Sequence, residues 1–437
     1  MKQFFCGVII LLFLCLFNTC PIHNNTQDEE PDYHIPIIWK SDIQRPFAWQ
    51  ITSDETGVYF YSFQKNDFTT VKFNKLDWKT GSTIWSTNYF EEVSLYPPII
   101  EGDYIYATLD DNVILCFDKE NGKQLARIRI TYNSQDVWIT SNYYLYNNYF
   151  YFGCGKKISG DIYNFYLARI NTDLIMKNGS SAEQLVEPEL LWQSRYNDNG
   201  GIQSRWYNGR IRSRPFVYND IAYCNTVTLD LDVPVELAGI NINTKEEVLY
   251  DSFGVNGSDI LDHGWEKNPF YEKDGILYYL SRSIAAYDIK NHQKLYHIMF
   301  PLGTPKEKYY GAGGFLDVTF YNNKIYYTTQ GTNYLGDTGS RNIFCISEKD
   351  GKQVWSDIPK RSEALGGKPI IYDNKMFVPH MNGVRVYDAD NGKLLGVEKS
   401  IEGAGVCFNQ LNGSTMITSM LSDEYPNGQL IALDLEK

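Results

Sequence analysis

The sequence predicts an all-β fold built from repeated four-stranded antiparallel units, and three observations support this prediction. Aromatic residues make up 15% of the chain, with 34 Tyr, and such residues favour pleated strands. Tight turns such as FDKENG recur, each preceded by an apolar and aromatic run. Amphipathic helical periodicity is nearly absent, and the one predicted helix is SSAEQLVEPE, with Ser180 or Ser181 as its N-cap.

The most complete copy of the unit is found at residues 96–130. Pro97 and Pro98 open it, at a place where proline removes no hydrogen bond from the sheet. The strings YIYATL and VILCF follow as the second and third strands, and KQLARIRI as the fourth. Asp, Asn and Gly at the intervening turns accept the backbone angles that tight connections need. The middle strands are apolar on both faces, which predicts that neighbouring sheets cover them.

The first twenty residues, MKQFFCGVIILLFLCLFNTC, have the layout of a secretory signal. The apolar run is too short for a typical membrane span. This stretch resembles a bacterial lipoprotein leader, which implies cleavage before Cys20 and acylation of that cysteine. A plain secretory signal is the alternative. Residues 21–34 are polar and flanked by proline, as in a flexible tether.

Charge and cysteine usage restrict the partners. The formal net charge of −13 does not attract nucleic acid or anionic lipid, so we expect membrane contact through the lipid anchor only. Five cysteines follow the leader, and all lie in strand-like runs. We expect them to be small buried apolar residues rather than disulfides or metal ligands. They are Cys116, Cys154, Cys224, Cys345 and Cys407.

The recurring third turn counts the units. It begins at Asp77, Asp118, Asn171, Asn241, Asp288, Ser347, Asp388 and Asp434. The eighth unit ends at Lys437 without a fourth strand, whereas IPIIWKSDI (residues 35–43) is shaped like one. Pairing this N-terminal strand with the last unit would remove two exposed sheet edges. We therefore predict a single eight-bladed β-propeller over residues 35–437, in which residues 35–43 complete the last blade.

Two copies identify the repeat type. LDWKTGSTIW (residues 76–85) and ISEKDGKQVW, which ends at Trp355, are similar to the AxDxxTGxxxW docking motif of PQQ-like β-propeller repeats. The resemblance implies that Trp85 and Trp355 pack between adjacent blades. Trp39 and Trp192 are expected to play the same part. The other copies carry Ala126, Leu249, Tyr296 and Gly396 at this position.

The resemblance leads to three functional hypotheses. In size, blade number, leader and repeat type the chain is similar to the propeller lipoprotein of the outer-membrane β-barrel assembly machine. This implies a non-catalytic, monomeric scaffold that binds envelope proteins, at the periplasmic face of the outer membrane or at the cell surface. A module that binds an acidic peptide or a glycan is the second hypothesis. A quinone-dependent dehydrogenase is the weakest.

The enzyme hypothesis lacks its expected residues. Quinone-dependent alcohol dehydrogenases share the ring, and this resemblance implies a Ca²⁺ site, an Asp base and adjacent cysteines, but the chain has no Cys-Cys pair. Asp388 to Gly392 begins like a calcium loop, yet Lys399 stands where a bidentate Glu is required. We expect no catalytic residue, no metal ligand, and neither pyrroloquinoline quinone nor Ca²⁺.

The best candidates for binding precede the first strand of several blades, where the chain should reach one mouth of the ring. Arg binds carboxylates or phosphates and stacks on aromatic rings, which suits an acidic ligand or a glycan. The alternative is that these side chains stack between blades and pair with nearby carboxylates. The candidates are Trp49, Trp138, Arg205, Trp206, Arg210, Arg212, Arg214, Trp265 and Lys267.

Overall fold

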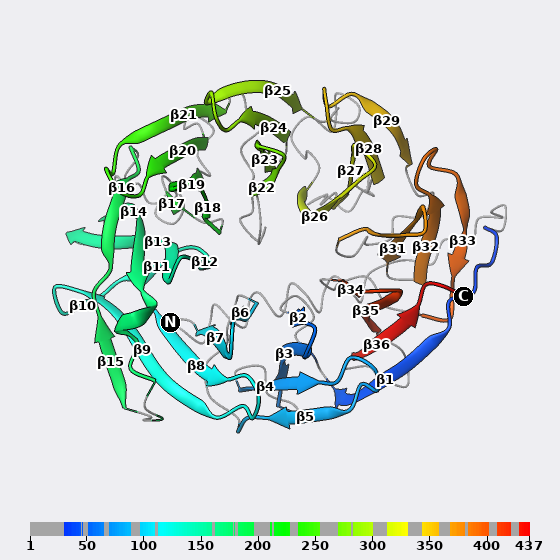
Figure 1. Cartoon of the computed structure of the whole chain (residues 1–437), viewed down its shortest axis with the longest axis horizontal. Coiled ribbons are helices and arrows are strands. Elements are labelled where there is room, and N and C mark those ends of the chain that lie inside the picture. The colour runs from blue at the N-terminus through cyan, green and yellow to red at the C-terminus, as the bar shows by residue number, and fades with distance from the viewer. Residues whose placement is uncertain are drawn as a thin grey trace. The chain divides into compact units, whose positions relative to one another are not determined.

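The computed structural model describes residues 30–44, 46, 51–64, 70–88, 97–109, 112–159, 162–177, 179, 182–195, 210–211, 214–227, 235–253, 270–280, 283–299, 313–330, 343–357, 368–380, 383–401, 409–420 and 428–437. Asp32–Lys437 is one compact unit, and only residues 30 and 31 of the other unit, Met1–Pro31, are described. The described strands form eight sheets that stand around a ring as blades (Figure 1). The predicted all-β, eight-bladed propeller is confirmed.

The first four blades, given from the innermost strand outward, follow the chain. Blade 1 contains β2 (Thr52–Asp54), β3 (Gly57–Phe63), β4 (Val71–Leu76) and β5 (Thr83–Ser86). Blade 2 contains β6 (Ile99–Glu101), β7 (Tyr104–Leu109), β8 (Val113–Asp118) and β9 (Gln124–Tyr132), with β10 (Gln135–Asp136) and β15 (Glu183–Val186) added at β9. Blade 3 contains β11 (Trp138–Ile139), β12 (Tyr144–Tyr146), β13 (Tyr149–Ser159), β14 (Ile162–Asn171) and β16 (Glu189–Gln193). Blade 4 contains β17 (Arg210–Ile211), β18 (Phe216–Tyr218), β19 (Ile221–Val227), β20 (Val235–Asn241) and β21 (Glu247–Phe253).

The remaining blades are regular and four-stranded. Blade 5 contains β22 (Phe270–Lys273), β23 (Ile276–Leu280), β24 (Ser283–Asp288) and β25 (Gln293–Met299). Blade 6 contains β26 (Gly313–Tyr321), β27 (Lys324–Gln330), β28 (Ile343–Ser347) and β29 (Gln353–Asp357). Blade 7 contains β30 (Ile370–Tyr372), β31 (Lys375–His380), β32 (Gly383–Asp388) and β33 (Leu394–Glu398). Blade 8 contains β34 (Gln410–Asn412), β35 (Thr415–Met420), β36 (Gln429–Asp434) and β1 (Ile37–Gln44).

The last blade closes the ring as predicted. β1 pairs antiparallel with β36, with Trp39 opposite Ala432. Residues just before β1 also contact blade 7, because the Tyr33 backbone N–H donates to the Val397 carbonyl at 3.0 Å. The N-terminal segment therefore joins blades 7 and 8 before the chain enters blade 1.

The hydrophobic core lies between adjacent blades rather than within one sheet. Between blades 1 and 2, for example, Tyr59, Phe73 and Trp85 form one cluster with Ile105 and Leu115. Both faces of each middle strand are covered, as the apolar strings predicted.

Four of the predicted cysteines belong to these buried layers and are unbridged. They are Cys116, Cys154, Cys224 and Cys345. Burial raises the pKa of the Cys116 and Cys154 thiols to about 12, so these thiols stay protonated near neutral pH. Cys407 lies outside the described residues.

Three tryptophans of outermost strands dock onto a turn of the next blade. The indole Nε1 of Trp39, Trp85 and Trp355 donates to the carbonyl of Trp78, Lys119 and Ala389, at 2.8, 3.2 and 3.0 Å. Each ring also covers the glycine of that turn, where a Cβ would collide with the indole; the glycines are Gly81, Gly122 and Gly392. These glycines have positive φ angles of 68°, 71° and 74°, which side-chain-bearing residues rarely adopt.

Two other blades use the same turn with a different residue. The Tyr296 hydroxyl of blade 5 donates to the Glu348 carbonyl at 2.9 Å, in the manner of the indoles. In blade 4 the glycine position holds Lys245, with φ of 64°. Trp192 of blade 3 is only half-buried there, and its Nε1 donates to the Glu247 carboxylate at 3.1 Å.

The outermost strand of every blade has a bulged residue near its start, and β1 has a second irregularity between Lys40 and Gln44. In blade 1, Lys75 lies opposite Trp85 and Leu76 opposite Thr83, which leaves Ile84 as the bulged residue. The bulged residues are Ile38, Ile84, Leu125, Leu191, Val248, Leu295, Val354 and Leu395. All are apolar, and each directly precedes the position of the docking tryptophan. A bulge twists the strand and interrupts its ladder, which hinders pairing with a further strand.

The predicted helix at SSAEQLVEPE is wrong. Residues Glu183–Val186 form β15, which pairs in parallel with β9 of the preceding blade. The side chains alternate along β15, because Gln184 and Val186 are covered whereas Glu183 and Leu185 are exposed. A partner strand distant in sequence therefore outweighed the local helix signal.

Replacing Gly122 by Ala should destabilise the protein more than replacing Gly102 of the same blade. Both glycines have positive φ, but a Cβ on Gly122 would lie 2.7 Å from the Trp85 ring, whereas Gly102 has open space around it. Backbone strain alone should cost about 1 kcal/mol in Gly102→Ala. The collision should raise the loss to about 2–4 kcal/mol in Gly122→Ala. Urea unfolding would compare the two variants, and equal losses would contradict the docking role.

The carboxylate that binds the segment before the closing strand should make the stability of the fold depend on pH. The buried Glu398 carboxylate accepts the Ile35 N–H at 2.7 Å and the Ser400 N–H at 2.8 Å. Burial alone would raise the pKa of Glu398, but these hydrogen bonds and the nearby His34 hold it below its ordinary value of 4.5. The carboxylate therefore stabilises the fold above that pH, and this contribution is lost as the pH falls through the lowered pKa.

Glu398→Gln tests this contribution. The variant should be about 1–2 kcal/mol less stable than the parent at pH 7. The gap should close as the pH falls through the lowered pKa of Glu398, because the parent carboxylate then becomes protonated. Urea unfolding from pH 7 to pH 2.5 would measure it, and a gap that does not change with pH would rule out the ionised carboxylate as its source.

Candidate functional site

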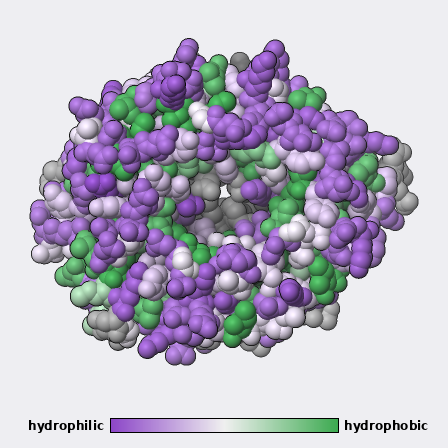
Figure 2. Space-filling view, viewed as in Figure 1, coloured by the Kyte–Doolittle hydropathy of each residue, from purple (hydrophilic) through white to green (hydrophobic). Residues whose placement is uncertain are grey.

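Three of the nine predicted binding residues lie in the described part of the chain: Trp138, Arg210 and Arg214. All three belong to the inner side of blades 3 and 4, at or just before β11, β17 and β18 (Figure 1). The side of the ring seen in Figure 2 is mostly hydrophilic and is hollowed near its centre. The other predicted residues lie outside the described residues: Trp49, Arg205, Trp206, Arg212, Trp265, Lys267 and the lipidation residue Cys20.

Trp138 and Arg210 come from neighbouring blades and stack on each other. The guanidinium carbon of Arg210 lies 4.0 Å from the centre of the indole ring. Tyr163 and Phe165 of β14 meet the same indole edge-on, with ring centres 5.5 and 5.9 Å away. We call Trp138, Tyr163, Phe165 and Arg210 the aromatic–Arg stack.

The local sequence explains how the stack forms. Trp138 lies opposite Gly155 in the β11–β13 pairing, and Phe165 lies opposite the same glycine in the β13–β14 pairing. A Cβ at Gly155 would approach the Phe165 ring to 3.0 Å and the indole to 3.4 Å. The glycine therefore lets the two rings meet across the strand.

Arg214 occupies a more enclosed position between the same blades. Its guanidinium carbon lies 4.8 Å from the centre of the Tyr144 ring. Tyr144 in turn packs on Phe216 of blade 4, with ring centres 5.5 Å apart. Burial lowers the pKa of Arg214, although the nearby Tyr144 and Tyr271 hydroxyls oppose that effect. Arg214 thus stacks between blades, which is the alternative that the sequence left open for these residues.

A further cation lies on the other face of the same hairpin. β13 and β14 are the longest paired strands of blade 3, and their side chains alternate between the two faces. Lys156 Nζ lies 4.2 Å from the centre of the Tyr132 ring, on β9 of blade 2. The hairpin therefore carries a cation–aromatic contact toward blade 2 and the aromatic–Arg stack toward blade 4.

The stack has the chemistry of an anion site with an apolar platform. A guanidinium that stacks by its face directs its N–H groups along the plane, where a carboxylate or phosphate can accept them. Aromatic rings beside it favour a flat apolar surface such as a sugar face or a peptide side chain. Such contacts contribute about 0.5–2 kcal/mol each, depending on solvent exposure.

Glu236 is a buried carboxyl that the sequence reading missed. It is fully buried in β20, and it accepts hydrogen bonds from the Ser194 hydroxyl at 3.0 Å and the Tyr250 hydroxyl at 3.3 Å. Burial raises its pKa, although these hydroxyls and Arg195 oppose the shift. The sequence signal was a single acidic residue within the apolar run VELAGI.

The segment between β14 and β16 forms a second notable surface. After β14 it continues through the 3-10 helix η2 (Thr172–Leu174) to β15, and the Gly179 N–H donates to the Leu125 carbonyl at 2.9 Å. Leu174, Met176 and Leu185 are 57, 60 and 65% exposed. These are the highest exposures among the described large apolar residues. We call residues 172–187 the blade 3 insert.

The described residues contain neither a cluster of metal-binding side chains nor a helix suited to span a membrane. Among them, no group of three or more His, Cys, Asp and Glu side chains is arranged to hold a metal ion. Within the same residues, no helix has the length and apolar character that crossing a membrane requires.

Comparison with known families agrees with the repeat type. Residues 36–160 match the family model described as outer membrane protein assembly factor BamB. The matched part begins with the closing strand β1 and ends with β13. The sequence matches no curated protein.

The solved structures that match this chain include two dehydrogenases and, at a lower score, BamB. The quinohemoprotein alcohol dehydrogenase from Comamonas testosteroni has a TM-score of 0.66 at 10% identity, over 92% of this chain and 76% of that chain. A europium-containing methanol dehydrogenase has a TM-score of 0.61 at 12% identity, over 92% and 93%. BamB from Moraxella catarrhalis has a TM-score of 0.42 at 10% identity, over 92% and 98%.

At such identities the two dehydrogenases establish likeness of fold alone. The predicted resemblance to the PQQ-like propellers is confirmed by the family match together with the eight blades. The chain is thus an eight-bladed propeller, and its residues 36–160 match the family model described as outer membrane protein assembly factor BamB.

Proposed function

We propose that the protein is a non-catalytic scaffold of the bacterial cell envelope, held at a membrane by a lipid on Cys20. The match of residues 36–160 to a family described by outer membrane protein assembly carries this proposal. The leader-like first twenty residues and the acidic charge of −13 agree with export and with attachment through an acyl chain. The partners are envelope proteins, and the scaffold acts as a monomer without quinone, Ca²⁺ or another cofactor.

The blades support this role through their regularity. Their middle strands are buried and apolar, and the charged side chains at the turns often join neighbouring blades. Lys119 binds Asp54 at 3.0 Å and Lys324 binds Asp390 at 2.7 Å across blade boundaries. A rigid ring of this kind presents surfaces to other proteins with little cost in conformational freedom.

Cross-linking and purification of the full chain from detergent-solubilised membranes of its own bacterium tests the scaffold role. We expect repeated recovery of the same envelope protein in amounts comparable to the bait. Cys20→Ser should abolish incorporation of labelled palmitate and reduce that recovery, because the chain is no longer concentrated at the membrane. Recovery of no envelope protein in replicate experiments would refute the scaffold proposal, and retained palmitate would refute the anchor.

The aromatic–Arg stack favours a second function, the binding of an acidic glycan or peptide. Arg210→Ala would remove the cation while leaving the blades intact, and Arg195→Ala is a matched control. Arg195 also stacks on a ring, 3.6 Å from the centre of Tyr250, but it lies at the outermost strands and is half-exposed. We expect a hexamer of galacturonic acid or of glutamic acid to bind the parent and Arg195→Ala alike.

Calorimetry should find at least tenfold weaker binding of the same hexamers to Arg210→Ala, which corresponds to about 1.4 kcal/mol. Equal loss in both variants would indicate a general charge effect rather than a site. No binding to the parent would eliminate this second function. A thermal shift with quinone and Ca²⁺, together with dye reduction, would instead favour the dehydrogenase alternative.

A further inference from the structure

β15 differs from the outermost strands of the ring because no bulge interrupts it. It pairs with β9 in continuous parallel register, from Glu183 opposite Arg127 to Val186 opposite Ile130. Among the residues that the structure describes, β9 is the only strand paired with β15. The outer edge of β15 therefore presents backbone N–H and C=O groups without the bulge that hinders pairing elsewhere in the ring.

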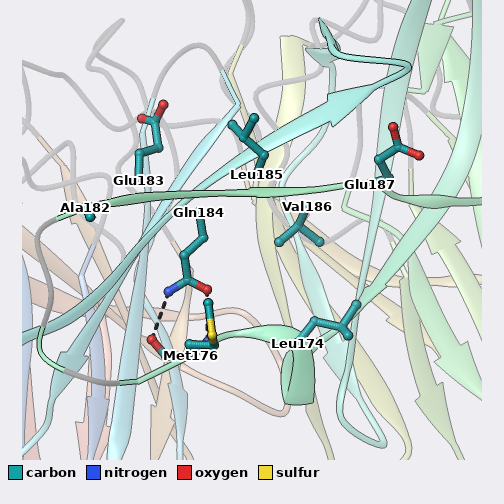
Figure 3. A pocket seen from close by; sticks show the side chains of 8 residues that line it. All are labelled: Leu174, Met176, Ala182, Glu183, Gln184, Leu185, Val186 and Glu187. Carbon is teal, nitrogen blue, oxygen red and sulfur yellow. Dashed lines mark hydrogen bonds between the residues drawn. The ribbon is translucent and has the colours of Figure 1, made fainter.

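A recess lies against one face of β15, between that strand and the segment that carries Leu174 and Met176 (Figure 3). All of its lining comes from the blade 3 insert: Leu174, Met176, Ala182, Glu183, Gln184, Leu185, Val186 and Glu187. Figure 3 shows Gln184 and Val186 directed toward Leu174 and Met176, and Glu183, Leu185 and Glu187 directed to the opposite side of the strand.

The wall of the recess is held in place by one side chain. Gln184 Oε1 accepts the Met176 N–H at 3.0 Å, and Gln184 Nε2 donates to the Met176 carbonyl at 2.8 Å (Figure 3). On the opposite side, Glu183 binds Arg127 at 3.1 Å and Arg129 at 2.7 Å. These contacts fix both β15 and the segment opposite it, so the recess is pre-formed.

We propose that the outer edge of β15 binds an extended segment of a partner protein by strand addition. Main-chain hydrogen bonds to β15 would supply affinity, and alternate apolar side chains of the segment would enter the recess beside Leu174 and Met176. This inference rests on the proposed scaffold function, because it names a surface through which the scaffold holds its partner.

The chain itself uses this mode at two blade edges. β15 lies in parallel along β9, with its Glu183 on two arginines of that strand. The segment at Asp32 and Tyr33 forms a parallel bridge to Val397 of β33, and Asp32 binds Lys399 at 2.6 Å. Extended segments are thus accepted beside outer strands of this fold, with charged side chains that complement the strand they join.

Charge identifies the kind of segment. Glu187 lies on the face of β15 opposite Leu174 and Met176 (Figure 3), and it forms no ion pair within the described residues. The whole chain is also acidic, with a formal charge of −13. A second copy of β15, paired antiparallel, would set Glu183 against Glu187 in both directions. Like charges directly opposite are unfavourable, so the occupant is a basic and apolar segment of another protein.

Three labelled ten-residue peptides provide the first test, with binding to the chain without its leader measured by fluorescence anisotropy. The first alternates Val and Lys, the second has the same charge with two central residues replaced by Pro, and the third alternates Val and Glu. We expect the first to bind at least tenfold more tightly than the others, because Pro removes ladder donors and Glu is repelled. Equal binding of all three, or binding of none, would overturn the proposal.

Variants locate the site. Leu174→Ser combined with Met176→Ser should weaken the Val-Lys peptide at least tenfold. Ile84→Ser combined with Leu295→Ser is the matched control, since these residues are 47 and 46% exposed on outer strands of other blades. The control should remain within twofold of the parent. Unchanged melting temperatures would establish folding, and parent-like binding by the recess variant would refute the recess as the site.

Hydrogen exchange and co-purification separate this inference from the scaffold role. The peptide should slow amide exchange at residues 183–187 and leave the outer strand of blade 1 unchanged; protection elsewhere alone would contradict strand addition.

In the membrane cross-linking experiment, loss of the partner in the recess variant supports the inference. Equal recovery by parent and variant would refute the β15 edge while leaving the scaffold role intact. Recovery by neither would refute the scaffold role itself.

Discussion

The ring depends on one repeated contact, the docking of an outermost-strand side chain onto a turn of the next blade. The turn supplies a carbonyl that accepts the indole hydrogen, and its glycine lets the ring lie flat against the backbone. Because Trp39 of the closing strand makes this contact with Gly81, the chain closes its ring by the same interaction that joins blades 1 and 2. The apolar layers between blades then follow from the spacing that this contact imposes.

The interaction is weakest where the blades depart from the pattern. Blade 2 has Ala126 in place of tryptophan, and the turn of blade 4 has Lys245 in place of glycine, which leaves Trp192 half-buried. The same part of the ring holds the long β13–β14 hairpin, the aromatic–Arg stack and the blade 3 insert. Among the described residues, strands beyond the regular four occur in blades 2 to 4, whereas blades 5 to 8 show four strands each.

Local signals in the sequence predicted the blades. The features that were not predicted depend on contacts between residues that are distant in sequence. Turns such as Asp118 to Gly122 need unusual backbone angles, and Asp, Asn and Gly are the residues that accept them. The turns can therefore be counted from the sequence without a structure. Glu183–Val186 was misread as helix because its alternation is short and its partner is β9. The meeting of Trp138 with Arg210 depends on the approach of two blades and was not predictable as a pair. The apolar residue before each docking position was visible in the sequence, but its role as a bulge required the pairing register.

The bulges explain why the periphery of such a ring does not pair with other chains at random. Eight outermost strands would otherwise present eight edges to solvent, and an apolar residue lifted out of the ladder breaks each of them near its start. β9 continues for seven residues beyond its bulged Leu125, farther than any other outermost strand within the described residues, and β15 lies along that extension. β15 covers the edge of β9 and becomes the new edge strand, but no bulge interrupts β15 itself. Flanking carboxylates at Glu183 and Glu187 then discourage pairing with another copy while leaving the backbone open to a basic strand, so specificity at this edge comes from charge rather than from a break in the ladder.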